Sequence, residues 1–431
     1  MESCTTQSEL LPYENLMCAC IPFQDAGGVH TTRLIESAEV DWPEFVRQCV
    51  RHGIAQHAAD YLEPYANRLP QDVWTCLERI RHANGERNAV MFTAASRLLL
   101  ALAAAEIRVL ALKGVALSLT AYDDPGVRPF ADIDILVDAE NMDAAGRIAE
   151  ECGFALDGEG AHPLKHHVAY RAQADKDILS ATMAAEFDPS ITPEILERDS
   201  RAIKLEIHQC LVRSVSGLRK ETDQSVFWDR PQIVCLPDGT PMATPSIEAG
   251  IVHLCEHAAQ HRFDRLLFAT DLIRIIQLNS NNISWSTVEA IAVQSSTASG
   301  VYRMLDLVRR EFNAPVPQEI IDTLRVADVD ASLAATPTLK HVFRTGNLDI
   351  REAIWDQARN SDWRGFLSTT WQIAFPPAPF MRDIYGDHSR LTMAALTLAR
   401  PLQLTGRLAR VLCRRRVRGL HAQLAKGTRS A

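Results

Sequence analysis

The chain has 431 residues, of which 47% are hydrophobic and 23% are charged. These values are ordinary for globular proteins, so they exclude a disordered, fibrous or small disulfide-stapled class, and the length predicts two or three domains. The net charge of −9 hides an asymmetry, because residues 388–431 hold ten Lys or Arg and no Asp or Glu, which leaves 35 basic and 54 acidic residues, or −19, on the first 387. The sequence therefore predicts an acidic body with a basic end.

The N-terminus and the cysteines predict a cytoplasmic protein. The first twenty residues carry Glu2, Glu9 and Glu14 before any basic residue and lack the apolar core of a secretory signal. No stretch reaches the roughly 18 apolar residues that a membrane-spanning helix needs. The ten cysteines are dispersed with no CxxC pair, as reduced thiols are, and only Cys18 and Cys20 are close enough in sequence to suggest a metal pair.

Apolar residues recur at helical spacing through the first quarter of the chain, which predicts a helical N-terminal segment over residues 1–84. The pattern then changes to short runs that alternate apolar and polar residues, typical of half-buried strands, and predicts an α/β core over 85–240. Helices are predicted at 42–61, 73–80, 89–105, 115–122 and 139–151, and strands at 107–112, 132–137, 166–171 and 202–212.

From Pro245 onward the pattern is almost entirely helical, which predicts a helical domain over 241–387 and a basic helical tail over 388–431. Ser246 is a suitable N-cap for the first of these helices. The acidic stretch at 172–200 is expected to be a solvated insertion. Later helices are predicted at 301–312, 319–326, 351–373 and 391–424.

The strongest chemical signal is a set of three carboxylates on two predicted strands. Asp132 and Asp134 alternate with Ile133, so both point to one face of their strand, and Glu206 lies on another strand. Converging carboxylates repel one another unless a cation neutralises them, and oxygen ligands suit Mg²⁺ or Mn²⁺. Since Mg²⁺ keeps open positions for phosphate oxygens, the set favours phosphoryl or nucleotidyl transfer.

A Lys-Gly turn at a predicted helix start supplies the complementary half of a nucleotide site. Gly114 lets a phosphate approach the backbone, and the helix start offers unpaired N–H groups. Lys113 adds a point charge for the outer phosphates, and Arg128 is placed in sequence to reach the same anion. Either motif alone, Asp-x-Asp or Lys-Gly, is common at solvated strand ends and turns. The occurrence of both in this order along the chain is what favours a nucleotide site.

Three strings resemble a poorly characterised bacterial nucleotidyltransferase family of the DNA polymerase beta-type superfamily, which has the pattern LKG…Y…RP…DIDLLV, then EIHW, then HLCxHAxxH. The matching strings are LKGVALSLTAYDDPGVRPFADIDILV (112–137), LEIHQCL (205–211) and HLCEHAAQHRFDRLLFATDLIRII (253–276). This resemblance implies an α+β fold class with a small mixed-sheet core, a helical N-terminal segment and a helical C-terminal domain.

The resemblance also assigns roles. Asp132 and Asp134 match the metal-binding aspartates, Glu206 matches the third carboxylate, which helps to position the attacking hydroxyl, and Gly114 matches the glycine that opens the phosphate-binding helix. The chain departs from the superfamily in having Lys-Gly where Gly-Ser or Gly-Gly is usual, and in the seventeen residues that separate Gly114 from Asp132.

The implied reaction is transfer of an NMP group from an NTP to a hydroxyl of a small-molecule or peptide/protein acceptor, with release of pyrophosphate. The helical C-terminal domain would shape the acceptor pocket. His208 would then act as a base or acceptor contact, or it would orient Glu206. The alternative, from another class, is a non-catalytic nucleotidyltransferase-fold binding or antitoxin-like module.

Three further features leave alternatives open. His253, His257 and His261 share one helical face and either bind a metal or line the site. Asp271 lies in an apolar run and is expected to pair with Arg262, Arg265 or Arg274. The basic tail is suited to contact an anionic membrane surface, or to dock on the acidic body; it has no aromatic residues, which disfavours nucleic acid as a partner.

Overall fold

The computed structural model of the protein describes residues 10–21, 28–37, 39–157, 167–175, 201–211, 225–327 and 337–344. These residues belong to one unit, assembled from Met1–Ala161, Lys165–Arg213 and Glu221–Ala353. Most of the predicted insertion at 172–200, the predicted helices at 351–373 and 391–424, and the basic tail lie outside the described residues.

Five strands form a mixed sheet in the order β1-β2-β5-β4-β3. The strands are β1 (Val109–Leu112), β2 (Asp132–Val137), β3 (Ala155–Leu156), β4 (His167–Gln173) and β5 (Ala202–His208). β2 and β5 run parallel, whereas the other three pairings are antiparallel. The predicted α+β class with a mixed sheet is therefore confirmed.

The helices that precede the sheet differ from the predicted ones at two of the predicted ranges. They are α1 (Pro12–Ala19), α2 (Val29–Ile35), α3 (Trp42–Arg51), α4 (Ala55–Leu62), the 3₁₀ helix η2 (Glu63–Arg68) and α5 (Gln71–Ala104). Of these, α1, α2 and η2 were not predicted individually. The helix predicted at 42–61 is broken in two, because Gly53 adopts a positive φ of 71° that ends the first part. The helices predicted at 73–80 and 89–105 are one continuous helix.

The remaining elements include a hairpin that the sequence interpretation did not contain. It joins β6 (Gln232–Cys235) to β7 (Pro241–Thr244), and β7 contacts β1. Ser246 caps the following helix, as predicted, by accepting a hydrogen bond from the backbone N–H of Ala249. The other helices are α6 (Lys113–Thr120), η3 (Ala139–Asn141), α7 (Met142–Glu151), η4 (Ser225–Trp228), α10 (Ile247–Gln260), α11 (Leu266–Leu278), α12 (Trp285–Gln294), α13 (Ala298–Phe312), α14 (Gln318–Ala327) and α15 (Leu339–Arg344).

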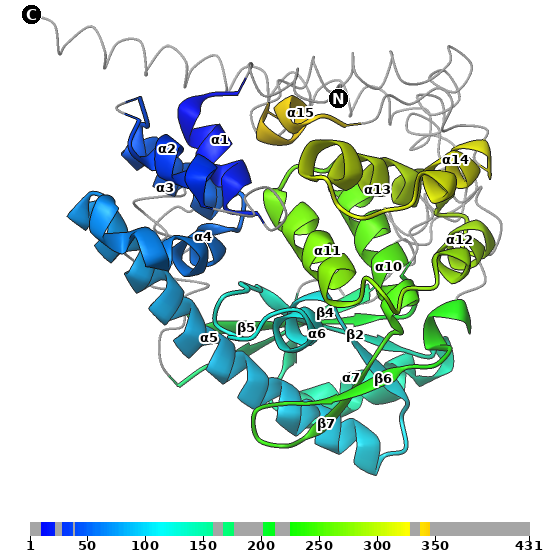
Figure 1. Ribbon diagram of the computed structural model, residues 1–431. Coiled ribbons are helices and arrows are strands. Elements are labelled where there is room, and N and C mark those ends of the chain that lie inside the picture. The colour runs from blue at the N-terminus through cyan, green and yellow to red at the C-terminus, as the bar shows by residue number, and fades with distance from the viewer. Residues whose placement is uncertain are drawn as a thin grey trace, which may run out of the picture. The chain divides into compact units, whose positions relative to one another are not determined.

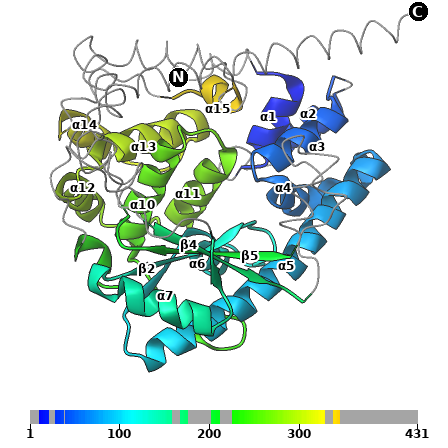
Figure 2. The ribbon, with the colours of Figure 1, turned by 180° about the vertical axis from the view of Figure 1, so that it is seen from behind.

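The sheet separates two cores because its strands alternate. One face carries Ile133, Ile135, Leu205 and Ile207, which are buried in a single apolar cluster with residues of α5 and α7. The other face carries the polar residues of β2 and β5 and lies toward α10 and α11, which belong to a second apolar cluster. Figures 1 and 2 show α5 and α7 on one side of the sheet and α10 and α11 on the other.

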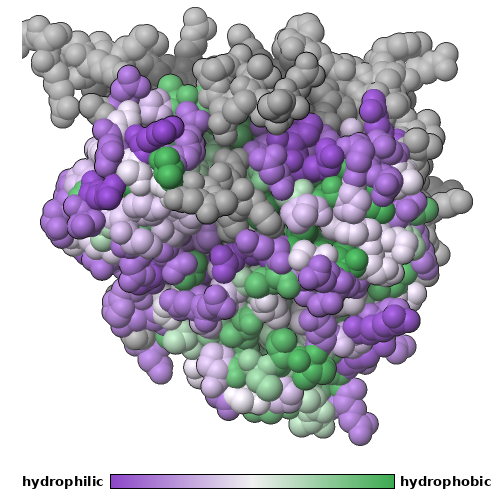
Figure 3. Space-filling view, viewed as in Figure 1, coloured by the Kyte–Doolittle hydropathy of each residue, from purple (hydrophilic) through white to green (hydrophobic). Residues whose placement is uncertain are grey.

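The surface seen in Figure 3 is mostly polar, with an apolar area low on this face, where β6 and β7 lie. The side chain of Ile233 in β6 is 66% exposed. Among the described helices, none has both the length and the apolar character that crossing a bilayer requires.

Candidate active site

Strand register brings the three predicted carboxylates together. In the parallel pair, Asp134 of β2 lies opposite Glu206 of β5, so both side chains point to the same face. Asp132 lies two residues before Asp134 on the same strand, so its side chain points to the same face. Carboxylate oxygens of the three residues lie within 4.8 Å of one another. Residues more than seventy positions apart in sequence thus form one acidic cluster.

Asp134 lies at the centre of this cluster. Its side chain is 2% exposed, and its Oδ1 accepts hydrogen bonds from Lys113 Nζ at 3.3 Å and from His208 Nε2 at 2.7 Å. Burial by itself would raise the pKa of Asp134, but Lys113 and His208 outweigh burial and hold this pKa well below its usual range. Asp134 is therefore ionised at neutral pH.

The pKa of Asp132 is shifted in the opposite direction from that of Asp134. Burial, followed by the charges of Asp134 and Glu206, raises the pKa of Asp132 to about 7. The three carboxylates are therefore not all readily ionised at neutral pH without an added cation. Three oxygen donors that repel in this way fit a hard divalent ion such as Mg²⁺ or Mn²⁺.

Glu206 is more accessible, with 27% of its side chain exposed, and it has a histidine on each side. Its Oε2 lies 3.4 Å from His208 Nε2 and its Oε1 lies 3.6 Å from His167 Nε2. Burial tends to raise the pKa of Glu206, but its interactions with His208 and His167 lower it by more than burial raises it. The pKa of Glu206 is therefore below its usual value. His208 has a raised pKa: burial lowers it, but its hydrogen bonds to Asp134 and Glu206 raise it more.

The turn from β1 into α6 places Lys113 and Gly114 beside the cluster. Lys113 has a positive φ of 43°, which is uncommon for a residue with a side chain and sharply reverses the chain direction. A Cβ on Gly114 would lie 2.3 Å from Phe130 Cβ and 3.0 Å from Arg128 Nη1. Packing of Phe130 thus accounts for the glycine, and this side of Gly114 is filled by protein rather than open to a phosphate.

Arg128 does not lie beside an open anion position. Its guanidinium is buried and donates to Asp271 of α11, from Nε to Oδ1 at 3.2 Å and from Nη2 to Oδ2 at 2.8 Å. Its Nη1 donates to the carbonyl of Pro129 at 3.0 Å. The expectation that Asp271 pairs with Arg262, Arg265 or Arg274 is wrong, because Arg128 occupies both carboxylate oxygens.

His257 of α10 lies near the carboxylate cluster, with His253 on the same helix and His261 directly after it. Rings of His253 and His257 are 6.3 Å apart, and those of His257 and His261 are 4.5 Å apart. Burial, and then the charge of Lys113, lowers the pKa of His257 well below its usual value. His257 is therefore neutral at pH 7. Because the charge of Lys113 acts on it, His257 lies near Lys113, as expected for a residue that lines the carboxylate site.

The model of a family described as uncharacterised nucleotidyltransferases matches residues 38–313. The chain belongs to this family. The matched region contains the three carboxylates, Lys113 and the α10 histidines. No curated protein matches the chain. One solved structure, an antigenic nucleotidyltransferase-like protein from Paracoccidioides brasiliensis, is 16% identical over 49% of this chain and 92% of its own, with a TM-score of 0.30.

Arg87 of α5 is a further cation near Asp132 that the sequence interpretation did not contain. Burial lowers the pKa of Arg87, while the charge of Asp132 raises it. In the described part of the chain, its buried Nε has no hydrogen-bond partner. No sequence signal marks Arg87, because it lies within a long helix and comes close to Asp132 only through the fold. The same holds for His167, which lies opposite His208 in the sheet.

Cys18 and Cys20 are both buried free thiols. Burial raises the pKa of each thiol well above its usual value. Metal binding by cysteine needs the thiolate, which burial disfavours here.

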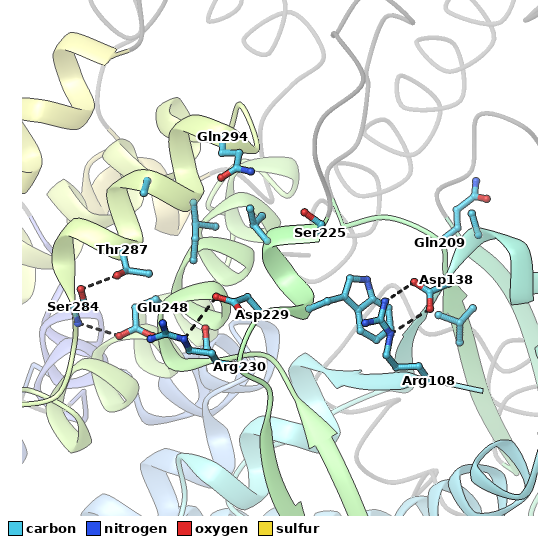
Figure 4. A pocket seen from close by; sticks show the side chains of 17 residues that line it. Arg108, Asp138, Gln209, Ser225, Asp229, Arg230, Glu248, Ser284, Thr287 and Gln294 are labelled. Atoms are coloured by element: carbon cyan, nitrogen blue, oxygen red, sulfur yellow. Dashed lines mark hydrogen bonds and ion pairs between the residues drawn. The ribbon is translucent and has the colours of Figure 1, made fainter. Parts of the chain in front are cut away.

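A cavity of about 1060 Å³ opens at the other end of β2 from Asp132 (Figure 4). Arg108 forms one wall: it pairs with Asp138 at 2.9 Å and lies 4.1 Å from the ring centre of Trp228. The opposite wall comes from α10 and α12. Asp132, Asp134 and Glu206 are not among the residues that line it, so this cavity is separate from the carboxylate site.

Proposed function

We propose that the protein is a metal-dependent nucleotidyltransferase of the DNA polymerase beta-type superfamily, which moves an NMP group from an NTP to a hydroxyl of a small-molecule or peptide/protein acceptor. The observation that carries this proposal is the convergence of Asp132, Asp134 and Glu206 on neighbouring parallel strands, with carboxylate oxygens within 4.8 Å. A cytoplasmic location is part of the proposal, on the grounds of the cysteine pattern.

Asp132, Asp134 and Glu206 would hold Mg²⁺ or Mn²⁺. When bound, the ion neutralises charge on the phosphates and on the attacking and leaving oxygens. The pKa of about 7 for Asp132 supports this assignment, since a cation would relieve the repulsion that raises it.

Glu206 is the carboxylate that the acceptor can approach, because it is more exposed than Asp134. It orients the acceptor hydroxyl and takes its proton as the oxygen attacks the α-phosphorus in line. The new O–P bond forms while the bond from the α-phosphorus to the bridging oxygen breaks, and pyrophosphate leaves with that electron pair.

Lys113 and Arg87 are the cations we assign to the phosphates. Lys113 Nζ is within 3.3 Å of Asp134, so it lies at the carboxylates themselves. Arg87 has a buried Nε with no partner among the described residues, and a phosphate oxygen is a suitable acceptor. Arg128 and Gly114 act differently from the sequence-based expectation: Arg128 positions the segment before β2, and Gly114 makes room for Phe130.

His208 is assigned to positioning rather than to proton abstraction. Its Nε2 lies 2.7 Å from Asp134 Oδ1 and 3.4 Å from Glu206 Oε2, and hydrogen bonding to these carboxylates raises the pKa of His208. The single N–H at Nε2 donates to Asp134 and lies beside Glu206, which orients the two carboxylates, and a ring nitrogen that carries this hydrogen has no lone pair with which to act as a base.

The proposal is tested by mass spectrometry. The purified protein is incubated with Mg²⁺, an NTP and pools of hydroxyl-bearing metabolites or peptides, and products are searched for an added nucleotide mass. The proposal predicts such a product with wild type and none with Asp132→Asn. Adduct formation that is equal in both proteins would contradict it.

A further inference from the structure

We infer that His167, Glu206 and His208 form a second metal site, which takes a transition ion such as Zn²⁺ rather than Mg²⁺. One nitrogen from each histidine and a Glu206 oxygen lie within 4.8 Å of one another. The inference concerns binding of an ion and stands whether or not the protein transfers nucleotides.

Strand pairing brings His167, Glu206 and His208 together, as it does the three carboxylates. Glu206 and His208 are two residues apart on β5, so they share a face, and His167 on β4 lies opposite His208. The imidazole rings of His167 and His208 are 5.1 Å apart. Three potential ligands therefore come from two paired strands, whose backbone fixes their spacing.

Each histidine nitrogen lies close to a different oxygen of Glu206. His208 Nε2 lies 3.4 Å from Glu206 Oε2, and His167 Nε2 lies 3.6 Å from Glu206 Oε1. Bonds of about 2.0–2.2 Å in tetrahedral geometry place neighbouring ligand atoms about 3.3–3.6 Å apart. Each nitrogen is therefore at about this spacing from Glu206, and an ion bonded to both nitrogens and to one oxygen requires the Glu206 carboxylate to rotate so that this oxygen faces both rings.

The donor chemistry separates this set from the carboxylate cluster. Two imidazole nitrogens with one carboxylate suit Zn²⁺, Co²⁺ and related ions, whereas Mg²⁺ prefers oxygen alone. His167 and Glu206 keep 21% and 27% of their side chains exposed, which leaves a route for the ion and a free coordination position. Binding would release the proton that His208 Nε2 shares with Asp134.

Glu206 belongs to both ligand sets. An ion at the histidines would therefore engage one Glu206 oxygen while the other faces the carboxylate cluster, as in sites where a carboxylate lies between two ions. The site would hold two ions of different kinds, a hard one at Asp132 and Asp134 and a softer one at His167 and His208.

Co²⁺ titration of the full-length, chelator-treated protein in excess Mg²⁺ tests the inference, because histidine-ligated Co²⁺ in four-coordination absorbs visible light. We expect one Co²⁺ per chain, displaced by Zn²⁺ and not by Mg²⁺. His167→Gln should weaken Co²⁺ binding by about tenfold or more. His261→Gln, which removes a nearby histidine outside the set, and Asp132→Asn should each bind Co²⁺ as wild type does.

Two outcomes would overturn the inference. In the first, His167→Gln, shown by circular dichroism to be folded, binds Co²⁺ as tightly as wild type. In the second, which needs no variant, Mg²⁺ displaces Co²⁺ from wild type, which would place the ion in the carboxylate cluster. Neither outcome bears on nucleotide binding, so failure here is distinct from failure of the proposed reaction.

Discussion

Arg128 and Asp271 form a buried, bidentate ion pair, with Nη2 2.8 Å from Oδ2, that ties the segment entering β2 to helix α11. Tyr122 donates to the same carboxylate at 2.8 Å, and Arg274 lies 4.6 Å from the centre of the Tyr122 ring. The strand that carries Asp132 and Asp134 is thus held in place by a helix more than 130 residues further along the chain.

Asp271→Asn should destabilise the fold by about 3–5 kcal/mol, because it leaves the buried Arg128 charge without its partner. Chemical denaturation followed by circular dichroism measures the change. Glu36→Gln is the matched control: it breaks the pair between Arg68 and Glu36, whose side chains are 48% and 61% exposed, and should cost less than about 1 kcal/mol. Equal effects of the two substitutions would show that burial of the Arg128 pair is unimportant.

Asp132 and Asp134 should respond in opposite ways to replacement by asparagine. Asp134→Asn removes the partner of Lys113 and His208 and should lower the free energy of unfolding by about 3 kcal/mol. At pH 6 Asp132 is largely neutral in the folded state, below its pKa of about 7, but ionised in the unfolded state, so folding must protonate it and Asp132→Asn should raise the free energy of unfolding there by about 1–3 kcal/mol.

The effect of Asp132→Asn on the free energy of unfolding should depend on pH, with a sign set by the raised pKa of Asp132. The raised pKa means that, between about pH 4 and pH 7, the folded state keeps a proton which the unfolded state has lost, so the wild-type protein loses stability as the pH rises through this range and the loss levels off above about pH 7. In the absence of metal, the free energy of unfolding of Asp132→Asn relative to wild type should therefore increase between pH 5 and pH 8. Unfolding curves at both pH values test this, and a difference that stays constant would contradict it.

Arg87→Gln should weaken binding of an NTP by about tenfold without lowering stability, since it removes a charge whose buried Nε has no partner among the described residues. Arg79→Gln, on an exposed position of the same helix, is the control and should bind as wild type does. Nucleotide titrations of both variants measure the effect. Wild-type affinity in Arg87→Gln would remove this residue from the phosphate site.

His57 should make the fold sensitive to acid. Burial, and then the charge of Arg274, lowers the pKa of His57 from 6.5 to about 4. Between these values the unfolded state binds a proton that the folded state does not, so stability falls as the pH falls, by about 1.4 kcal/mol per pH unit. His57→Gln should lose this slope, whereas His82→Gln, at a side chain 81% exposed, should retain it. Unfolding curves from pH 6.5 to 4 measure both, and equal slopes in wild type and His57→Gln would refute the assignment.

Period-two patterns predicted the site strands well, because 132–137 and 202–208 have one apolar and one polar face and a single-residue shift would bury charge. The hairpin of β6 and β7 was missed although its signal is present, since Pro237, Asp238 and Gly239 form a turn between alternating residues.

The break predicted within α5 has a physical cause. The apolar pattern fails near Asn84 and Asn88, yet both are buried and donate to backbone carbonyls of the loop before β2, including those of Gly126 and Arg128. Polar residues thus face inward here, where hydrophobic periodicity predicts an exposed face. Arg87 and His167 could not be found from sequence, since no local pattern specifies that α5 lies beside Asp132 or that β4 pairs with β5.

The central claim is that the three carboxylates bind a nucleotide through a divalent ion. Isothermal titration of the chelator-treated protein with a non-hydrolysable NTP analogue, with and without Mg²⁺, tests it most directly. Binding should require Mg²⁺ in wild type and be lost in Asp132→Asn, a variant expected to stay folded. Binding of equal strength without Mg²⁺, or in that variant, would contradict the claim.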